Sequence, residues 1–149
     1  MELDNFTLEA YNENNKEHLE TIEKIDVDKK SKEYLGNTFS LINMINKRKE
    51  EDFLHNETYI SYYNNRPVGY IALTHNKDDY ELISGLIPIE RNQHLGALLL
   101  QEFSEKVFET IKDINELTLK INDKNLGSIK CAKLVGYVQD SKEKFNLRR

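Results

Sequence analysis

The sequence predicts an α/β fold in which a central mixed sheet is flanked by helices. Three segments rich in aromatic and β-branched residues, bounded by turn or loop signals, predict strands: 58–63, 68–74 and 80–87. An amphipathic helix then begins near Leu95 and leads into a further predicted strand at 117–121, which makes a β-α-β crossover. At 149 residues the chain has the length of one domain, and we expect 1–149 to form a single domain.

A short strand and two helices are predicted before these strands. Residues 6–10 predict the strand, and Asn15 is a good N-cap for the first helix. That helix carries apolar residues at three-residue spacing: Leu19, Ile22 and Ile25. The second helix is predicted from apolar residues followed by cations near its C-terminal end: Phe39, Ile42, Met44 and Ile45, then Lys47, Arg48 and Lys49.

Turns and one long helix complete the predicted arrangement. Polar turns at 64–67 and 76–79 separate the three middle strands, and 140–143 predicts a hairpin in the C-terminal tail. The helix that begins near Leu95 presents one apolar stripe at four-residue spacing: Leu99, Phe103, Val107 and Ile111.

Composition predicts an ordinary soluble protein of the cytoplasm. Hydrophobic residues make up 38% of the chain and charged residues 32%. No apolar run approaches the ~18 residues that span a bilayer, and no signal peptide is recognised, so we expect no membrane association. The single cysteine, Cys131, excludes an intrachain disulfide and fits a reducing compartment.

Net charge bears on the choice between nucleic acid and small cationic partners, and histidine spacing bears on metal binding. The formal net charge of −5 argues against nucleic acid and permits a cationic amine as substrate. The four histidines share no metal-ligand spacing, so we predict no metal site. The oligomeric state stays open between monomer and dimer.

The segment 86–103 is the most informative for function. It reads as the end of a hydrophobic strand, a short polar loop and the first turn of a helix. The N–H groups of a first helical turn have no partner within the helix, and the helix dipole favours negative charge there. Gly96 and Ala97 are small enough for a phosphate to approach the main chain closely. Together these features predict a cradle for a pyrophosphate.

This segment resembles the acetyl-CoA-binding motif of the GNAT superfamily of N-acetyltransferases, Arg/Gln-x-x-Gly-x-Gly/Ala. Arg91 and Gly96 match the motif, whereas His94 stands at its first glycine. A second match follows, where the superfamily has Asn-x-x-Ala/Ser, a helix and then Gly-Phe or Gly-Tyr: Asn125, Ser128, Gly136 and Tyr137. Independently of the resemblance, Asn125 is a good N-cap and Gly136 a good helix terminator. The resemblance covers about residues 57–137.

The resemblance implies a GNAT fold and a cofactor. In the superfamily, the strands that correspond to 80–87 and 117–121 splay apart, and the pantetheine arm of acetyl-CoA lies in the gap. Acetyl-CoA is therefore expected as the acyl donor. Its expected contacts in this chain are Leu86, Ile87, Arg91, Gln93, His94, Leu95, Gly96, Ala97, Leu98 and Asn125.

The resemblance also implies a general base. Segment 81–86 is similar to the Glu-Ile-Gly-Tyr-Trp-Leu pattern of the branch that contains ribosomal-protein N-terminal acetyltransferases and spermidine acetyltransferases, which makes Glu81 the candidate. The segment differs from that pattern at Gly85, where an aromatic residue is usual. The alternative is that Glu81 is a strand carboxylate that faces solvent or pairs with a neighbouring Arg or Lys.

The proton donor for the leaving thiolate is a separate question. Many superfamily members have a Tyr seven residues after the Asn, and here that position is Ala132. Ser128 is the candidate that could hydrogen-bond the sulfur, and its alternative role is to satisfy a backbone N–H at the helix start. Tyr137 stands where the family usually has Phe, so we expect it in the core.

Three further residues have alternative roles. His94 either contacts a phosphate or occupies a turn whose backbone does the binding, and it costs more than Gly if the position needs a positive φ. Arg91 either pairs with a phosphate or is solvated. Cys131 is expected as a small core residue rather than a nucleophile.

These observations predict an N-acetyltransferase that moves an acetyl group directly from acetyl-CoA to a primary amine. The acceptor is not identified, and both small molecules and a protein N-terminus fit. The alternative is a catalytically weak acyl-CoA-binding sensor or interaction module with the same fold. Ala132 at the position of the Tyr, and His94 in the cradle, keep that alternative open.

Overall fold

The computed structural model describes residues 1–28, 41–49, 58–76, 79–91 and 94–149. The strands are β1 (Thr7–Ala10), β2 (Thr58–Tyr63), β3 (Arg66–Asn76), β4 (Asp79–Leu86), β5 (Glu116–Lys120), β6 (Val138–Ser141) and β7 (Lys144–Arg148). The helices are α1 (Lys16–Asp26), α3 (Leu41–Lys49), α4 (Leu95–Thr110) and α5 (Leu126–Val135), with a 3-10 turn, η2, at Pro88–Glu90. Phe39, expected in the second helix, lies outside the described residues.

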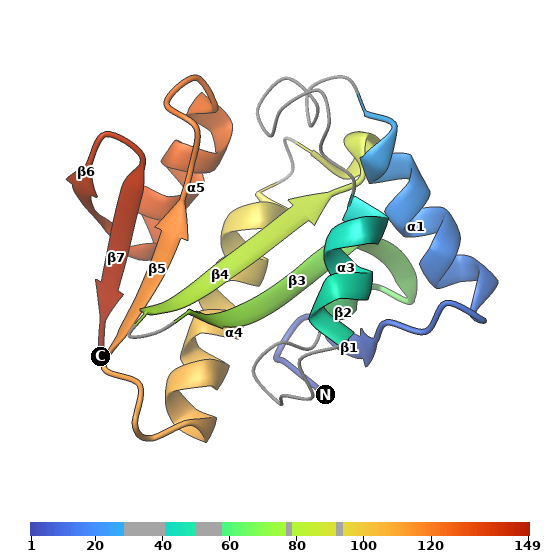
Figure 1. Cartoon of the computed structure of the whole chain (residues 1–149), viewed down its shortest axis with the longest axis horizontal. Coiled ribbons are helices and arrows are strands. Elements are labelled where there is room, and N and C mark those ends of the chain that lie inside the picture. The colour runs from blue at the N-terminus through green and yellow to red at the C-terminus, as the bar shows by residue number, and fades with distance from the viewer. Residues whose placement is uncertain (29–40, 50–57, 77–78, 92–93) are drawn as a thin grey trace.

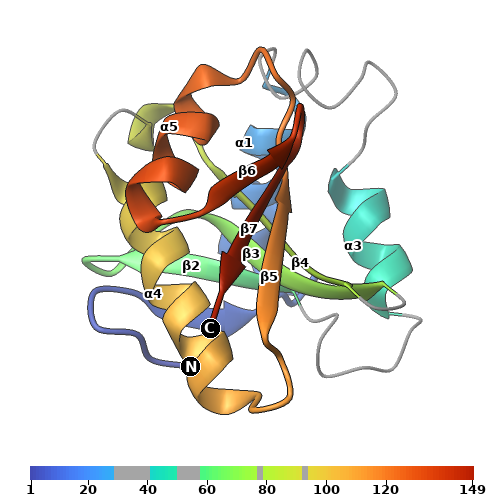
Figure 2. The ribbon, with the colours of Figure 1, turned by 90° about the vertical axis from the view of Figure 1, so that its left-hand side faces the viewer.

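All the described strands join one mixed sheet in the order β1-β2-β3-β4-β5-β7-β6 (Figure 1). Neighbouring strands are antiparallel except β4 and β5, which are parallel and are joined by the α4 crossover. Figure 2 shows α4 and α5 on one side of the sheet and α3 on the other. The α/β class and the mixed sheet predicted from the sequence are confirmed.

Two separate hydrophobic cores lie on the two faces of the sheet. One packs under α4 and α5 and contains the predicted α4 stripe: Leu99, Phe103 and Val107. Ile111, expected on that stripe, is only partly buried because it is the residue at which the helix ends. The other core packs α1 and α3 onto β2, β3 and β4, and Ile22, Leu41 and Ile60 are fully buried in it.

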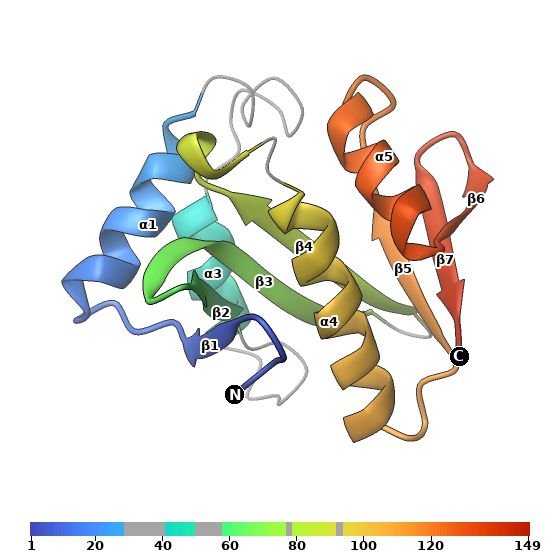
Figure 3. The same ribbon diagram turned by 180° about the vertical axis from the view of Figure 1, so that it is seen from behind.

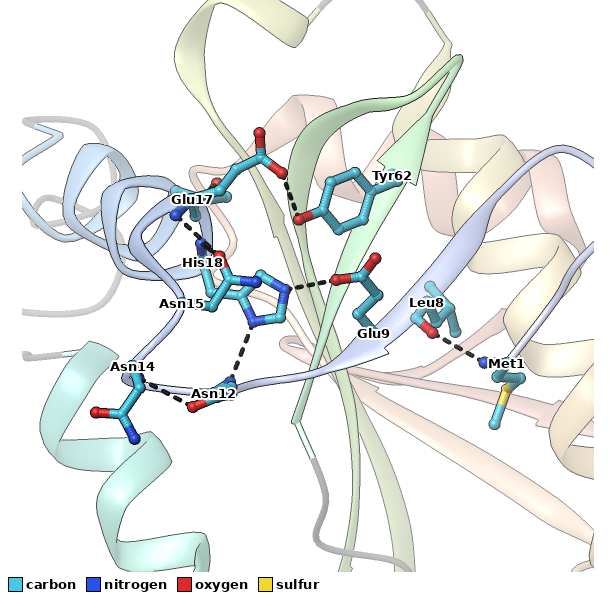
Figure 4. Close-up of polar contacts among 10 residues, drawn as sticks. Met1, Leu8, Glu9, Asn12, Asn14, Asn15, Glu17, His18 and Tyr62 are labelled. Carbon is cyan, nitrogen blue, oxygen red and sulfur yellow. Dashed lines mark hydrogen bonds and ion pairs between the residues drawn. The ribbon is translucent and has the colours of Figure 1, made fainter.

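A polar network fixes the start of α1 against the edge of the sheet (Figure 4). The side chain of Asn15 accepts hydrogen bonds from the N–H groups of Glu17 and His18, which confirms the predicted N-cap. His18 is 2% exposed, and its Nδ1 accepts from the Asn12 N–H at 3.1 Å. This leaves the proton of a neutral ring on Nε2, which lies 2.9 Å from Glu9 Oε1.

The β2–β3 hairpin differs slightly from the prediction. Asn64 and Asn65 form its turn with φ values of 51° and 63°, a conformation that asparagine tolerates better than most residues. Arg66 and Pro67, predicted as turn residues, belong to β3. Pro67 has no N–H to donate to a ladder, and it lies where the register with β2 shifts.

The sheet is split between β4 and β5. Within the described residues, Glu81 and Thr118 form the one register pair between these strands. By contrast, β3 follows β4 along its length, as far as Leu86 opposite Gly69. Figure 3 shows β4 and β5 diverging toward their C-terminal ends, behind α4 and α5. The predicted splay is therefore present, and it opens toward the start of α4.

Strands β3 and β4 approach closely near this opening, which yields a stability prediction. A Cβ atom on Gly69 would collide with the backbone carbonyl oxygen of Gly85. We expect Gly69→Ala to lower the free energy of unfolding by about 2–4 kcal/mol, because strand backbones must move apart. The measurement is urea denaturation followed by circular dichroism.

Gly96→Ala is the matched control for this change. A Cβ at Gly96 would lie 3.6 Å from Cys131 Sγ and 3.7 Å from Leu86 Cδ1, which are ordinary contacts. Ala is also the better helix former, so its effect should stay within about 1 kcal/mol. Equal unfolding midpoints for the two variants would contradict the close approach of β3 and β4.

Candidate cofactor and catalytic site

The turn into α4 has the backbone conformation that a glycine would favour. His94 is the N-cap residue with φ 61° and ψ 7°, and its exposed side chain makes no capping hydrogen bond. The positive φ considered for this position is therefore observed, and His is among the residues that adopt it more readily than most. The Leu98 N–H bonds back to the His94 carbonyl, so the N–H groups before it form the first turn of α4.

Two ion pairs hold the residues that follow β4: one reaches β3 and the other reaches the end of α1. Glu90 is 8% exposed and accepts from Arg66 Nε and Nη2 at 3.0–3.1 Å. Arg91 Nη1 donates to Asp28 Oδ2 at 2.8 Å, just beyond the end of α1. Arg91, expected to bind phosphate or to be solvated, is thus paired with a carboxylate. Gln93 lies outside the described residues.

Leu86 and Ile87 were both expected to contact the pantetheine arm, but only the Leu86 N–H faces the gap. The Ile87 N–H is bonded to the Val68 carbonyl at 2.9 Å, so it points toward β3. Successive residues of a strand direct their N–H groups to opposite edges, so the Leu86 N–H points toward the gap. Leu86 therefore suits a ligand in the gap, whereas the Ile87 N–H is already satisfied. Pro88 follows, where η2 begins.

Glu81 lies at the closed end of the gap, where β4 and β5 still pair. Its side chain is 15% exposed, and its Oε2 is 3.7 Å from Lys120 Nζ on β5. Because alternate strand residues share a face, Glu81 lies on the same side of the sheet as Ile83, which packs on the α1–α3 core. Pairing with a neighbouring Lys, given above as the alternative to a base role, is observed. Glu81 is five residues from Leu86, or about 17 Å along the strand.

An aromatic ring from the adjacent strand covers Gly85. Tyr70 on β3 is the register partner of Gly85, and it is 2% exposed. A Cβ on Gly85 would lie 2.7 Å from Tyr70 Cε1. The aromatic group that the sequence pattern lacks at position 85 is therefore supplied from β3, and its bulk explains why a side chain does not fit there.

Helix α5 has the predicted caps. Asn125 accepts a hydrogen bond from the Ser128 N–H at 3.2 Å, and Gly136 ends the helix with φ 109°. The Asn125 side chain, rather than the Ser128 hydroxyl, therefore satisfies this N–H, and the Ser128 side chain is exposed. Ala132 is fully buried in the core, so the position where many members have a Tyr faces away from solvent.

Tyr137 lies in the core, as expected, whereas Cys131, expected there too, is only half-buried. Tyr137 is 3% exposed and its hydroxyl lies 2.8 Å from Ser104 Oγ, while burial raises its pKa. The half-buried Cys131 has a raised pKa, chiefly because of burial, although the Ala97 N–H and the Lys130 charge lower it. Sγ of Cys131 thus links α5 to the first turn of α4. A thiol with a raised pKa is a poor nucleophile.

Several contacts at this site were not apparent from the sequence. Asp28 and Lys120 each pair with a predicted site residue from a distant part of the chain, and Tyr70 covers Gly85; no local motif marks these three residues. Among the described residues, no group of three or more His, Cys, Asp and Glu side chains could hold a metal ion. The described helices also include none with the length and apolar character needed to cross a bilayer.

Comparison with known proteins agrees with this geometry. The family model described as Acetyltransferase (GNAT) family matches residues 17–137. A search among curated protein sequences found no match.

Three solved structures illustrate the likeness in fold. An acetyltransferase (GNAT family) from Bacillus anthracis has a TM-score of 0.78 and 11% identity, covering 99% of this chain and 97% of the other. N-acetyltransferase PseH from Campylobacter jejuni, in complex with acetyl coenzyme A, has a TM-score of 0.64 and 15% identity, with 97% and 99% covered. Spermidine N-acetyltransferase from Vibrio cholerae, in complex with CoA and spermine, has a TM-score of 0.73 and 11% identity, with 97% and 95% covered.

The family match spans most of the chain, and it includes the split between β4 and β5, the turn into α4 and the capped α5. The chain therefore belongs to the acetyltransferase (GNAT) family.

Proposed function

We propose that this protein transfers an acetyl group from acetyl-CoA directly to a primary amine. The observation that carries the proposal is the break in β4–β5 pairing beyond Glu81, which opens beside the first turn of α4. The pyrophosphate would bind the N–H groups of that turn, and the pantetheine arm would follow the edge of β4 past Leu86. Complexes of family relatives with acetyl-CoA or CoA support this choice of donor.

Glu81 is the proposed general base. The attacking amine must be neutral, so its proton has to leave before or during formation of the new N–C bond. Glu81 lies at the closed end of the gap, which is where an arm entering beside α4 would bring the thioester. The present partner of Glu81, Lys120, is 63% exposed and so has room to move aside for an acceptor ammonium.

Departure of the thiolate completes the proposed reaction. As the N–C bond forms and the C–S bond breaks, the amine proton passes to Glu81 and the sulfur leaves as a thiolate. Ser128 is exposed at the start of α5 and is proposed to hydrogen-bond the sulfur, while solvent protonates it. Asn125, next to Ser128 in space, is proposed to contact the pantetheine amide.

Three observations bear on the class of the acceptor amine: a sequence pattern, a similar solved structure and the net charge. The Glu81–Leu86 pattern points to the branch of ribosomal-protein N-terminal and spermidine acetyltransferases, and a family relative was crystallised with spermine. A net charge of −5 favours a cationic acceptor, either a small amine or a protein N-terminus. We place the protein in the cytoplasm, where acetyl-CoA is available.

A second candidate function rests on Ala132. Its burial leaves α5 without a hydroxyl donor at the position of the usual Tyr. A catalytically weak acyl-CoA-binding sensor would have this feature. Calorimetric titration with acetyl-CoA, CoA and NAD, followed by a screen of amines, separates the candidates. Binding of acetyl-CoA with turnover supports the enzyme, binding without turnover supports the sensor, and no binding of either CoA species refutes both.

One prediction tests the proposed pyrophosphate cradle at the first turn of α4. Gly96→Glu places a carboxylate at the proposed pyrophosphate position, so we expect acetyl-CoA affinity to fall by more than about tenfold. Calorimetry on the folded variant measures this change. Gln101→Glu adds the same charge to the exposed face of α4 and should bind normally. Equal affinities of the two variants would mean that the pyrophosphate binds elsewhere.

The second prediction concerns the base. Glu81→Gln should lower turnover by about 10²-fold or more, with acetyl-CoA affinity little changed. The rate is measured with the first amine that the screen identifies. Glu116→Gln is the control, because Glu116 is also a strand carboxylate, paired with Arg148. Turnover and a pH profile like those of the wild type would remove Glu81 from the mechanism.

The third prediction concerns Arg91. If a phosphate of acetyl-CoA draws Arg91 from Asp28, the two anions compete for one guanidinium. Asp28→Asn should then tighten acetyl-CoA binding by about two- to fivefold, whereas Arg91→Ala should weaken it. Calorimetry gives both affinities, and thermal unfolding shows whether the variants remain folded. Weaker binding by both variants would show that the ion pair only shapes the loop.

A further inference from the structure

Glu81 belongs to a row of charged side chains that runs from β4 across β5 to β7. Alternate residues of a strand share one face of a sheet, and register partners on neighbouring strands share it too. Glu81 is the register partner of Thr118, and Lys120 lies two residues further along β5. Lys144 on β7 is the register partner of Lys120. The three charged residues therefore lie on the face of the sheet opposite α4, which Figure 1 views with α3 in front of β3.

Lys120 and Lys144 place two like charges side by side next to the proposed base. Residues directly opposite each other in an antiparallel pair have Cβ atoms about 4.5–5.5 Å apart, and like charges at such positions are unfavourable. The Lys120 side chain is 63% exposed and the Lys144 side chain is 35% exposed, so both are accessible to a ligand. An anion that contacts both ammonium groups would relieve their repulsion.

The present partners of the two lysines do not use their full hydrogen-bonding capacity. Lys120 Nζ is 3.7 Å from Glu81 Oε2, and Lys144 Nζ is 3.7 Å from Asp140 Oδ2. A hydrogen bond between an ammonium and a carboxylate is about 2.7–2.9 Å long. Among the described residues no carboxylate lies closer to either ammonium group. Both lysines can therefore donate hydrogen bonds to an incoming anion.

Binding of an acceptor ammonium at Glu81 would change the charge balance of this row. The Glu81 side chain is 15% exposed, and Lys120 is its one ion-pair partner within the described part of the chain. When an acceptor ammonium replaces Lys120 beside Glu81, Lys120 loses its counter-charge while Lys144 remains next to it. An acceptor with an anionic group near its amine supplies the missing counter-charge, whereas an acceptor with a second ammonium group is repelled.

We propose that the acceptor carries an anionic group, a carboxylate or a phosphate, close to its primary amine. Glu81 takes the amine, and Lys120 and Lys144 bind the anion. The inference rests on the proposed function, because it takes Glu81 as the general base. It narrows the acceptor from amines in general to those with a neighbouring anion, such as amino acids, and it makes polyamines poor acceptors.

The test uses pairs of primary amines that differ in the anionic group. The pairs are histidine and histamine, lysine and cadaverine, and phosphoethanolamine and ethanolamine. Release of the CoA thiol from acetyl-CoA gives kcat and KM for each compound. We expect the wild type to favour the anionic member of at least one pair by about tenfold or more in kcat/KM, because that member alone can bind both lysines.

Variants of the two lysines test whether they cause this preference. Lys120→Met and Lys144→Met remove one charge each and keep an apolar stem, so each should raise the KM of the anionic member by roughly three- to tenfold and that of its partner much less. Lys144→Met is the more specific change, because Lys144 pairs with Asp140 and not with Glu81. Lys112→Met, at an exposed lysine between α4 and β5, is the control and should resemble the wild type. Thermal unfolding checks that each variant is folded.

The outcomes separate this inference from the proposed function. A wild type that binds no acetyl-CoA in calorimetry refutes the proposed function and the inference with it. A wild type that binds acetyl-CoA overturns the inference alone if it acetylates the members without an anion equally well or better, or if it acetylates no member of any pair. A preference that survives unchanged in both lysine variants also overturns it, because the anion would then bind elsewhere. A preference confined to one type of pair, and lost in the variants, supports the inference and identifies the anion as carboxylate or phosphate.

Discussion

The end of pairing between β4 and β5 is the constraint on which the rest of the site depends. Glu81 and Thr118 hold the two strands together at one point, and β3 keeps β4 in place on its other side. Because β4 pairs only with β3 near Leu86, its other edge there can receive a ligand without loss of the sheet. The α4 crossover, which spans the same split, brings the first turn of a helix to the mouth of the gap.

Side-chain ion pairs hold the described residues that follow β4, 87–91. Arg66 donates to Glu90 through two nitrogens, and Glu90 is mostly buried while the Arg66 side chain is partly exposed. Arg91 ties the same segment to Asp28 after α1. His94, at the start of α4, has a left-handed backbone conformation that is less favourable than it would be for Gly.

Local signals in the sequence predicted much of the fold. The caps at Asn15, Asn125 and Gly136 depend on residues within a few positions, so they could be recognised without a structure. The apolar stripe of α4 and the splay between its flanking strands were also predicted, the latter from the family resemblance.

Contacts between distant segments could not be predicted in this way. The ring of Tyr70 covers Gly85 because of the β3–β4 register, and a single sequence does not fix that register. The pairing of Arg91 with Asp28 joins residues 63 positions apart. The sequence analysis offered phosphate or solvent for Arg91, so its carboxylate partner was found only in the structure, as was the partner of Glu81.

The two hydrophobic cores, on opposite faces of one sheet, have an evolutionary consequence. Substitutions at well-separated sites usually have additive effects on stability, so changes under α1 and α3 can accumulate with little influence on packing under α4 and α5. The layer that carries the start of α4 can then be retained while the opposite layer drifts. In a fold arranged in this way, the residues that select an acceptor can change during evolution while the layer at the start of α4 stays the same.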